Sequence, residues 1–162
     1  MPDTPTSAGP SFALADFLPY RLSVVTNRIS QCFARRYADS FQLSIAEWRV
    51  LAVVGNFAPM SSSDICEKTA MDKVKVSRAV SRLADRGLLT RRADRHDQRM
   101  HYLGLSRRGQ RVYDGVVPMA VAIERQLTSA LSAGERATLT GILDKLAGCV
   151  DELEAAEREN PT

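Results

Sequence analysis

Residues 72–83 read DKVKVSRAVSRL, and this stretch decides the fold because it divides into an apolar side and a cationic side. At 100° per residue of an α-helix, Val76, Val80 and Leu83 fall on one stripe that can face a core. The cationic side chains fall within an adjacent stripe about 80° wide; they are Lys75, Arg78, Arg82 and Arg86. The stretch therefore predicts a helix that packs on a small domain and presents a cationic face to water.

The sequence around this helix predicts a mainly α-helical chain with one small β-hairpin. Apolar residues at three- and four-residue steps predict helices over 14–39, 44–55, 61–70 and 73–87, one that begins at Ser106 and one that begins at Ser132. Ser44 with Glu47 forms a capping-box pattern, which marks a helix start. Short apolar runs at 88–92 and 100–105, on either side of a charged loop, predict a hairpin. This order of elements is typical of a winged helix-turn-helix.

Basic residues concentrate around the predicted helix and hairpin. Between Met71 and Arg111 the sequence has 12 Lys or Arg residues and 4 Asp residues, a net charge of +8, whereas the whole chain has a net charge of +3. A basic block in an otherwise acidic chain is the electrostatic footprint of a partner with a phosphate backbone. Because a merely solvated surface usually mixes the two signs more evenly, double-stranded DNA is the predicted partner.

Two features of this basic block suit DNA. An α-helix fits the major groove, where Arg donates two hydrogen bonds to guanine and short hydroxyl side chains reach phosphates or base edges. Arginines at the tip of a hairpin can enter a narrow minor groove, where the potential is most negative. The predicted DNA-binding residues are Ser62, Lys73, Lys75, Ser77, Arg78, Ser81, Arg82, Arg92, Arg95, His96 and Arg99. Asp94 and Asp97 are instead predicted to pair with arginines of the loop and to hold its shape.

Composition argues against several other classes of protein. No apolar run approaches the ~20 residues of a membrane helix, and the Pro/Ser/Thr-rich residues 1–12 are predicted to be a disordered tail of a cytoplasmic protein rather than a secretory signal. The three cysteines are scattered, and His96 and His101 lack ligand partners at metal-binding spacing, so no metal site, disulfide framework or cofactor is expected. No catalytic pattern stands out, so the chain is not predicted to be an enzyme.

Four motifs in chain order resemble the MarR family of bacterial regulators: DKVKVSRAVSRL at 72–83, RGLL at 86–89, DRHDQR at 94–99 and LGLSRRG at 103–109. The resemblance covers residues 14–155 and is most specific in the last two motifs. It implies that residues 41–105 form a winged helix-turn-helix lobe, with the fourth helix as recognition helix and the hairpin as wing. Residues 13–40 and 106–158 would be dimerisation helices of a homodimeric repressor that binds a pseudo-palindromic operator.

The two ends of the chain carry more apolar surface than one small lobe can cover. In the last helix, apolar residues recur at i, i+3, i+7, i+11 and i+14, which places them on one face. The predicted dimer-interface residues are Leu14, Phe17, Leu139, Ile142, Leu146, Val150 and Leu153.

Within the family, LSIAEWRV at 43–50 and MDKV at 71–74 are similar to a subgroup that controls catabolism of aromatic acids and responds to hydroxycinnamic acids or their coenzyme A thioesters. This similarity implies a small aromatic effector bound between the DNA-binding lobe and the dimer helices. The candidate ligand-binding residues are Tyr20, Arg21, Asn27, Trp48 and Arg49. Aromatic rings could stack on such a ligand and arginines could hold its anion. The alternatives are core packing for Trp48 and surface salt bridges for the arginines.

Two further functions stay open on the sequence. Some relatives in the family sense oxidants through a reactive cysteine, which is exposed and lies beside a cation. Cys32, in contrast, lies on the apolar stripe of the first helix and is predicted to be a buried core residue. A helical protein-interaction module could also use a basic face to bind an acidic protein. The aspartates and arginine of the 94–99 loop favour DNA over that alternative.

Overall fold

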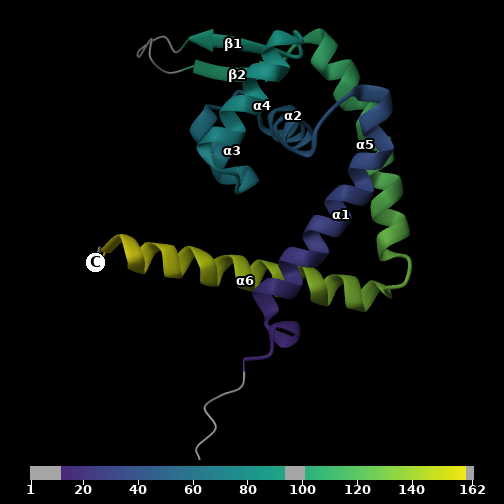
Figure 1. The fold of residues 1–162 in the computed structure, drawn as a ribbon, viewed down its shortest axis with the longest axis vertical. Helices are drawn as coiled ribbons and strands as arrows, with labels where there is room; N and C mark the ends of the chain where they lie inside the picture. The colour runs from purple at the N-terminus through teal and green to yellow at the C-terminus, as the bar shows by residue number, and fades with distance from the viewer. Residues whose placement is uncertain (1–11, 94–100, 160–162) are drawn as a thin grey trace, which may run out of the picture. The chain divides into compact units, whose positions relative to one another are not determined.

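The computed structural model describes residues 12–93 and 101–159, which form the helices and the hairpin of Figure 1. A short 3₁₀ helix, η1 (Leu14–Asp16), precedes α1 (Leu18–Phe41), α2 (Ile45–Phe57), α3 (Ser62–Thr69) and α4 (Lys73–Asp85). Strands β1 (Leu89–Ala93) and β2 (His101–Leu105) follow, and then α5 (Arg107–Thr128) and α6 (Ala133–Glu159). The chain divides into two compact units, Met1–Met119 and Ala120–Thr162. A mainly helical fold with one hairpin confirms the predicted fold class.

The core of the first unit is built where α2, α3, α4 and the hairpin pack together (Figure 1). The stripe of α4 that the sequence predicts to be apolar is buried, since Val76, Val80 and Leu83 expose 1%, 3% and 0% of their surface. Full burial of such a side chain stabilises a protein by about 1.5–3 kcal/mol. These contacts therefore fix α4 on the unit and decide which of its sides stays in water.

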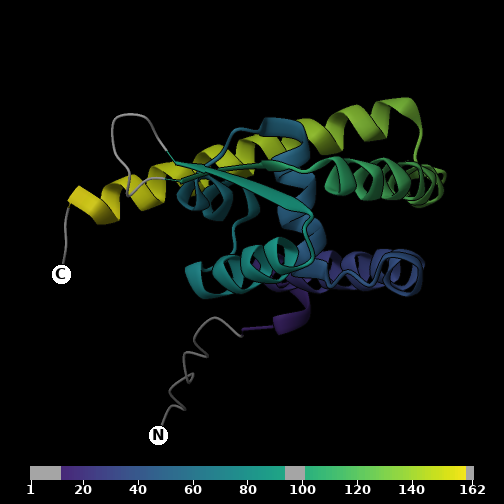
Figure 2. The ribbon, with the colours of Figure 1, turned by 90° about the horizontal axis from the view of Figure 1, so that it is seen from above.

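The hairpin is anchored to the helices at its base. β1 and β2 pair antiparallel, with Leu89 opposite Leu105 and Arg91 opposite Leu103. Met60, between α2 and α3, extends the sheet because its N–H donates to the carbonyl of Leu103 (3.2 Å) and its carbonyl accepts from the N–H of Leu103 (2.7 Å). Viewed from above, β2 leads directly into α5 (Figure 2).

Side-chain caps start α2 and α3 close to the predicted positions. The Ser44 hydroxyl accepts a hydrogen bond from the N–H of Glu47 (3.2 Å), and the Glu47 carboxylate accepts one from the N–H of Ser44 (2.7 Å). Ser61 and Asp64 form the same reciprocal pair (3.2 and 2.9 Å). Each pair satisfies two N–H groups that a helix start leaves without a helical partner.

The first helix is shorter than predicted. The sequence predicts one helix from Leu14, whereas α1 begins at Leu18 and the residues before it form the separate turn η1. The later start places Pro19 in the first turn of α1, where its missing N–H costs no helical hydrogen bond. A start at Leu14 would instead place this proline in the helix interior, where it removes a hydrogen bond. The predicted tail, apart from Phe12, lies outside the described residues.

A close junction joins the end of α4 to the start of α5. Gly87 adopts a left-handed φ of +67° and terminates α4. The Ser106 hydroxyl donates to the carbonyl of Gly87 (2.7 Å) and accepts from the N–H of Gly109 (2.9 Å). A Cβ atom on Gly109 would collide with the carbonyl oxygen of Leu88. In the LGLSRRG motif, the serine therefore caps α5 and the final glycine lets α5 approach the backbone before β1.

We expect Gly109→Ala to lower the free energy of unfolding by about 1–3 kcal/mol, because the backbone of Leu88 must shift to admit the methyl group. Gly141→Ala in α6 is the matched control: a Cβ there meets nothing within 4 Å. Alanine is the better helix former, so that change should raise the free energy of unfolding by about 0.5–1 kcal/mol. Urea unfolding at one fixed protein concentration measures both. Equal changes in the free energy of unfolding for the two substitutions would contradict the close approach of Gly109 to Leu88.

Candidate DNA-binding surface

Asp72 starts α4 and carries a full negative charge at neutral pH. Its carboxylate accepts a hydrogen bond from the N–H of Lys75 (2.8 Å) and lies 3.0 Å from Lys75 Nζ. The backbone hydrogen bond from Lys75, and then the side-chain hydrogen bond from the same residue, hold the pKa of the Asp72 carboxyl below its ordinary value. Lys75 is thus partly neutralised within its own helix. Lys73, Arg78 and Arg82 have no ion-pair partner among the described residues.

The outward side of α4 is polar and cationic. Val76, Ala79, Val80 and Leu83 are buried on the inward side. Every predicted DNA-binding residue of α4 is exposed; these residues are Lys73, Lys75, Ser77, Arg78, Ser81 and Arg82. The structure therefore brings all six to a surface that a duplex can reach, although their contacts with DNA stay a prediction.

A cavity of about 480 Å³ lies between α3, α4 and β1. Four predicted DNA-binding residues line it: Ser62, Lys73, Ser77 and Ser81. Arg91 of β1 also lines it, and the sequence analysis did not single out this residue. The two-residue period of a strand was the available signal, because it places Arg91 on the same side of β1 as the buried Leu89.

Arg86 is not part of the free cationic stripe, which corrects the prediction from helical spacing. Its guanidinium donates to the carbonyls of Phe41 and Gln42 (2.8 Å each), at the end of α1. These are carbonyls without a helical partner, and a cation near a helix C-terminus is stabilised by the helix dipole. The carbonyl of Arg86 in turn accepts a hydrogen bond from Arg108 (3.0 Å). Arg86 therefore connects the ends of α1 and α4 and the start of α5.

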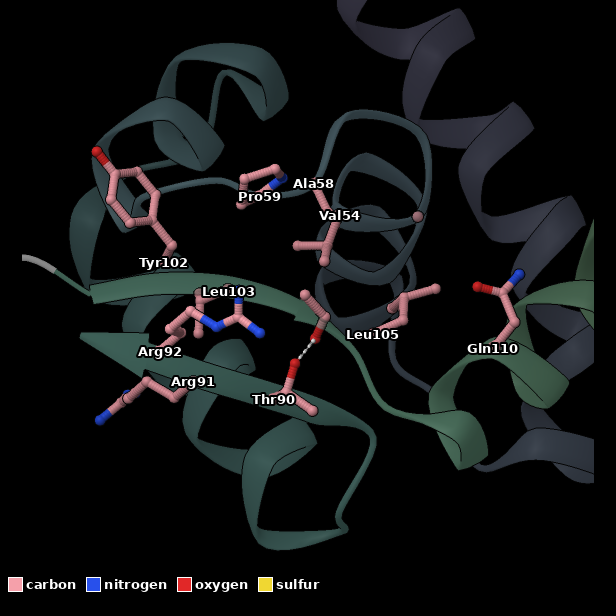
Figure 3. Close-up of a pocket in the computed structure, with 12 residues that line it drawn as sticks. Val54, Ala58, Pro59, Thr90, Arg91, Arg92, Tyr102, Leu103, Leu105 and Gln110 are labelled. Carbon is pink, nitrogen blue, oxygen red and sulfur yellow. Dashed lines mark hydrogen bonds between the residues drawn. The ribbon is translucent and has the colours of Figure 1, made fainter. Parts of the chain in front are cut away.

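The described part of the wing is its two strands. Arg91 and Arg92 leave β1 in different directions, and Thr90 donates a hydrogen bond across the pair to the carbonyl of Gly104 (3.2 Å; Figure 3). Arg92 lines an open cavity of about 600 Å³ beside the end of α2. The predicted wing residues Asp94, Arg95, His96, Asp97 and Arg99 lie outside the described residues.

Trp48 packs in a cluster of aromatic rings, as the core-packing alternative expects. Its ring stacks on Tyr113, with ring centroids 6.2 Å apart, and meets Phe33 and Tyr37 at 5.6 and 5.9 Å. Burial, the largest influence, raises the pKa of Tyr37 to about 12.

Arg49 is half-buried and donates to the hydroxyl of Ser30 (3.1 Å), and it forms no ion pair among the described residues.

The structure does not bring all five candidate ligand-binding residues together within one chain. Tyr20, Arg21 and Asn27 are exposed on α1. Trp48 contacts α1 at Phe33, which follows Tyr20 by 13 residues and therefore lies about 20 Å farther along the helix. The predicted pairing of Tyr20 with Trp48 around one ligand is absent from the described residues of the single chain.

The predicted dimer-interface residues lie mostly in water in the single chain. Six of them expose between 45% and 66% of their surface: Leu14, Phe17, Leu139, Ile142, Val150 and Leu153. Leu146 is half-buried.

Cys32 is exposed, so its predicted burial is wrong. The reason is that α1 packs on the core through Phe33, Tyr37 and Phe41, and Cys32 points away from that side.

Neither a membrane span nor a metal-ligand cluster is found in the described residues. None of their helices is both long and apolar enough to cross a membrane. They also contain no group of three or more His, Cys, Asp or Glu side chains that could hold a metal ion.

The arrangement of α2, α3 and α4 with a hairpin, and the exposed cations of α4, define a winged helix-turn-helix protein of the DNA-binding class. A model of the MarR family matches residues 41–100. NicR of Pseudomonas putida, an HTH-type transcriptional repressor, is 26% identical over 144 residues, which are 85% of this chain and 91% of NicR.

Two solved structures extend the comparison. A probable transcriptional regulator from Pseudomonas aeruginosa is 31% identical, with a TM-score of 0.69, over 83% of this chain and 99% of that one. BpsR of Bordetella bronchiseptica, whose DNA binding is regulated by 6-hydroxynicotinic acid, is 26% identical, with a TM-score of 0.75, over 86% of this chain and 98% of BpsR. The chain belongs to the MarR family of transcriptional regulators.

We expect Arg78→Ala to weaken binding to a selected DNA site by about 1–3 kcal/mol and to relax base preference at one position in each half-site. The reason is that Arg78 lies on the exposed side of α4, where a guanidinium can bind guanine. Arg136→Ala removes the same charge from an exposed position of α6 and is the control. Gel-shift titrations against a panel of single base-pair variants measure both effects. An unchanged preference at every position would show that Arg78 does not read a base.

Proposed function

We propose that the protein is a homodimeric repressor that binds a pseudo-palindromic operator and releases it when a small aromatic acid or its coenzyme A thioester binds. The observation that carries the proposal is the cationic outward side of α4, which the buried stripe of the same helix holds in place. The control of BpsR by 6-hydroxynicotinic acid supports the choice of an aromatic acid. Membership of a regulator family favours DNA over an acidic protein as the partner of the basic surface.

The dimer is proposed because the single chain leaves much apolar surface in water. Leu139, Ile142 and Val150 lie on one side of α6 and expose 45%, 49% and 51% of their surface. In a symmetric homodimer, a second copy of the chain would bury this apolar side of α6. Two copies would place their recognition helices about 34 Å apart, the spacing of successive major grooves.

Arg49 is the proposed anchor for the acid group of the effector. It is half-buried between α1 and α2, and its one hydrogen bond to the neutral Ser30 leaves its charge without a carboxylate among the described residues. An arginine in this state suits a carboxylate ligand, because the guanidinium can donate two parallel hydrogen bonds. The neighbouring aromatic cluster around Trp48 supplies the apolar walls that small-ligand pockets have.

A route from this region to DNA is proposed through Arg86. The Arg86 side chain binds the last carbonyls of α1, and its own carbonyl accepts a hydrogen bond from Arg108 of α5. A ligand that shifts α1 would therefore shift the end of α4 as well. Such a ligand releases DNA only by its difference in affinity for the two arrangements.

Redox control is the second candidate, and the exposure of Cys32 favours it more than the sequence did. An exposed thiol is open to oxidants, as a sensing cysteine must be. The two candidates differ in what releases DNA: a ligand in one case and oxidation of a thiol in the other.

Calorimetry with and without operator tests the ligand proposal. The DNA is selected by the protein from random-sequence duplexes, and the compounds are 6-hydroxynicotinic acid, p-coumaroyl- and feruloyl-coenzyme A, the free acids and benzoate. We expect one of them to bind, and about a 100-fold weakening of DNA affinity would correspond to about 2.7 kcal/mol of coupling. By reciprocity, operator must weaken ligand binding by the same factor. Arg49→Gln should remove ligand binding and leave the affinity for operator unchanged.

Two results would contradict the proposal. One is that no compound binds and that mild peroxide releases DNA from the wild type but not from Cys32→Ser, which supports the redox candidate. The other is that a compound binds equally well with and without operator, because equal affinities shift no equilibrium.

A further inference from the structure

Val74 is an apolar side chain in the middle of a cationic surface. It lies in the first turn of α4, between Lys73 and Lys75, and exposes 57% of its surface. Single exposed apolar residues are common on protein surfaces and often need no explanation. This position differs because the first turn of a recognition helix is the part that approaches base edges in the major groove.

The helix itself gives no reason for a valine here. At 100° per residue, Val74 lies about 170° from the centre of the buried stripe, so it faces directly away from the core. A β-branched side chain is a poorer helix former than alanine or lysine, so valine does not serve the stability of α4. Arg78 lies one turn farther along the same outward side.

The largest apolar feature that the base edges of the major groove offer to such a side chain is the C5-methyl group of thymine. The cytosine C5–H edge is smaller, and an apolar side chain pressed on the hydrogen-bonding groups of the bases leaves those groups unpaired at a cost. We infer that Val74 is a specificity-determining residue that contacts one thymine methyl group in each half-site. This inference rests on the proposed binding of DNA through α4.

The position of this thymine relative to the Arg78 contact follows from geometry. Four residues of a helix span about 6 Å along its axis, and successive base pairs are about 3.4 Å apart. The thymine read by Val74 therefore lies about two base pairs from the guanine read by Arg78, if that guanine is found.

The test removes the methyl group from the DNA and the valine from the protein in combination. Wild-type protein selects its site from random-sequence duplexes, and each thymine of that site is then replaced by deoxyuridine, which lacks only the methyl group. Wild type should lose about fourfold in affinity at one thymine per half-site, the effect of one buried methyl group. Val74→Ala should bind the thymine and uracil duplexes equally. Val25→Ala, which changes a similarly exposed valine of α1 (53%), should keep the wild-type difference.

The outcomes separate this inference from the proposed function. If no sequence-selective DNA is recovered, both fail. If DNA is recovered but no uracil replacement matters, or if Val74→Ala keeps the full difference between thymine and uracil, the role of Val74 is overturned and the DNA-binding function stands. Loss of the difference in Val74→Ala alone supports the inference. Circular dichroism should show the same helix content in both variants, since an exposed valine replaced by alanine favours the helix.

Discussion

Val76, Ala79, Val80 and Leu83 hold α4 against the rest of the first unit, and each exposes at most 3% of its surface. A helix is rigid about its own axis, so burying one side also fixes which residues form the opposite side. The lysines and arginines of α4 are thereby presented to water in a defined arrangement rather than on a mobile loop. The caps at Asp72 and Gly87 set the length of this surface but contribute less than the buried stripe does.

The end of α4 is held to other helices by hydrogen bonds, whereas its start is exposed to water. The Arg86 guanidinium donates hydrogen bonds to the carbonyls of Phe41 and Gln42 at the end of α1. Ser106 donates to the carbonyl of Gly87, and Arg108 donates to the carbonyl of Arg86. These hydrogen bonds connect the end of α4 with the end of α1 and with the first turn of α5. We propose that this junction is where a change in the dimer helices would reach the DNA-binding side.

Local patterns in the sequence predicted most of the fold. Helical spacing identified the buried stripe of α4, and the capping box of Ser44 marked the start of α2, because these features depend on neighbours within a few residues. The features that were missed depend on residues far apart in the chain. The bond from Arg86 to Gln42 spans 44 residues, and the exposure of Cys32 depends on how α1 packs against the core.

In the candidate site, too, features that depend on neighbouring residues could be predicted, and features that depend on distant residues could not. Exposure of the six predicted residues of α4 could be derived from one helix, whereas Arg91 lines the same cavity because β1 packs against α4. For the effector, the family resemblance grouped Tyr20 with Trp48, but Tyr20 lies about 20 Å along α1 from Phe33, the residue of α1 that Trp48 contacts. The resemblance could therefore suggest a ligand class without placing its binding residues.

Two copies of α4 are proposed to enter successive major grooves of one operator. Protection of guanine N7 from methylation by dimethyl sulfate measures this most directly, because N7 lies on the floor of the major groove. We expect two groups of protected guanines about 10 base pairs apart, with two chains bound per duplex. Stable binding that leaves every guanine N7 reactive, or that protects a single group with one chain bound, would contradict it.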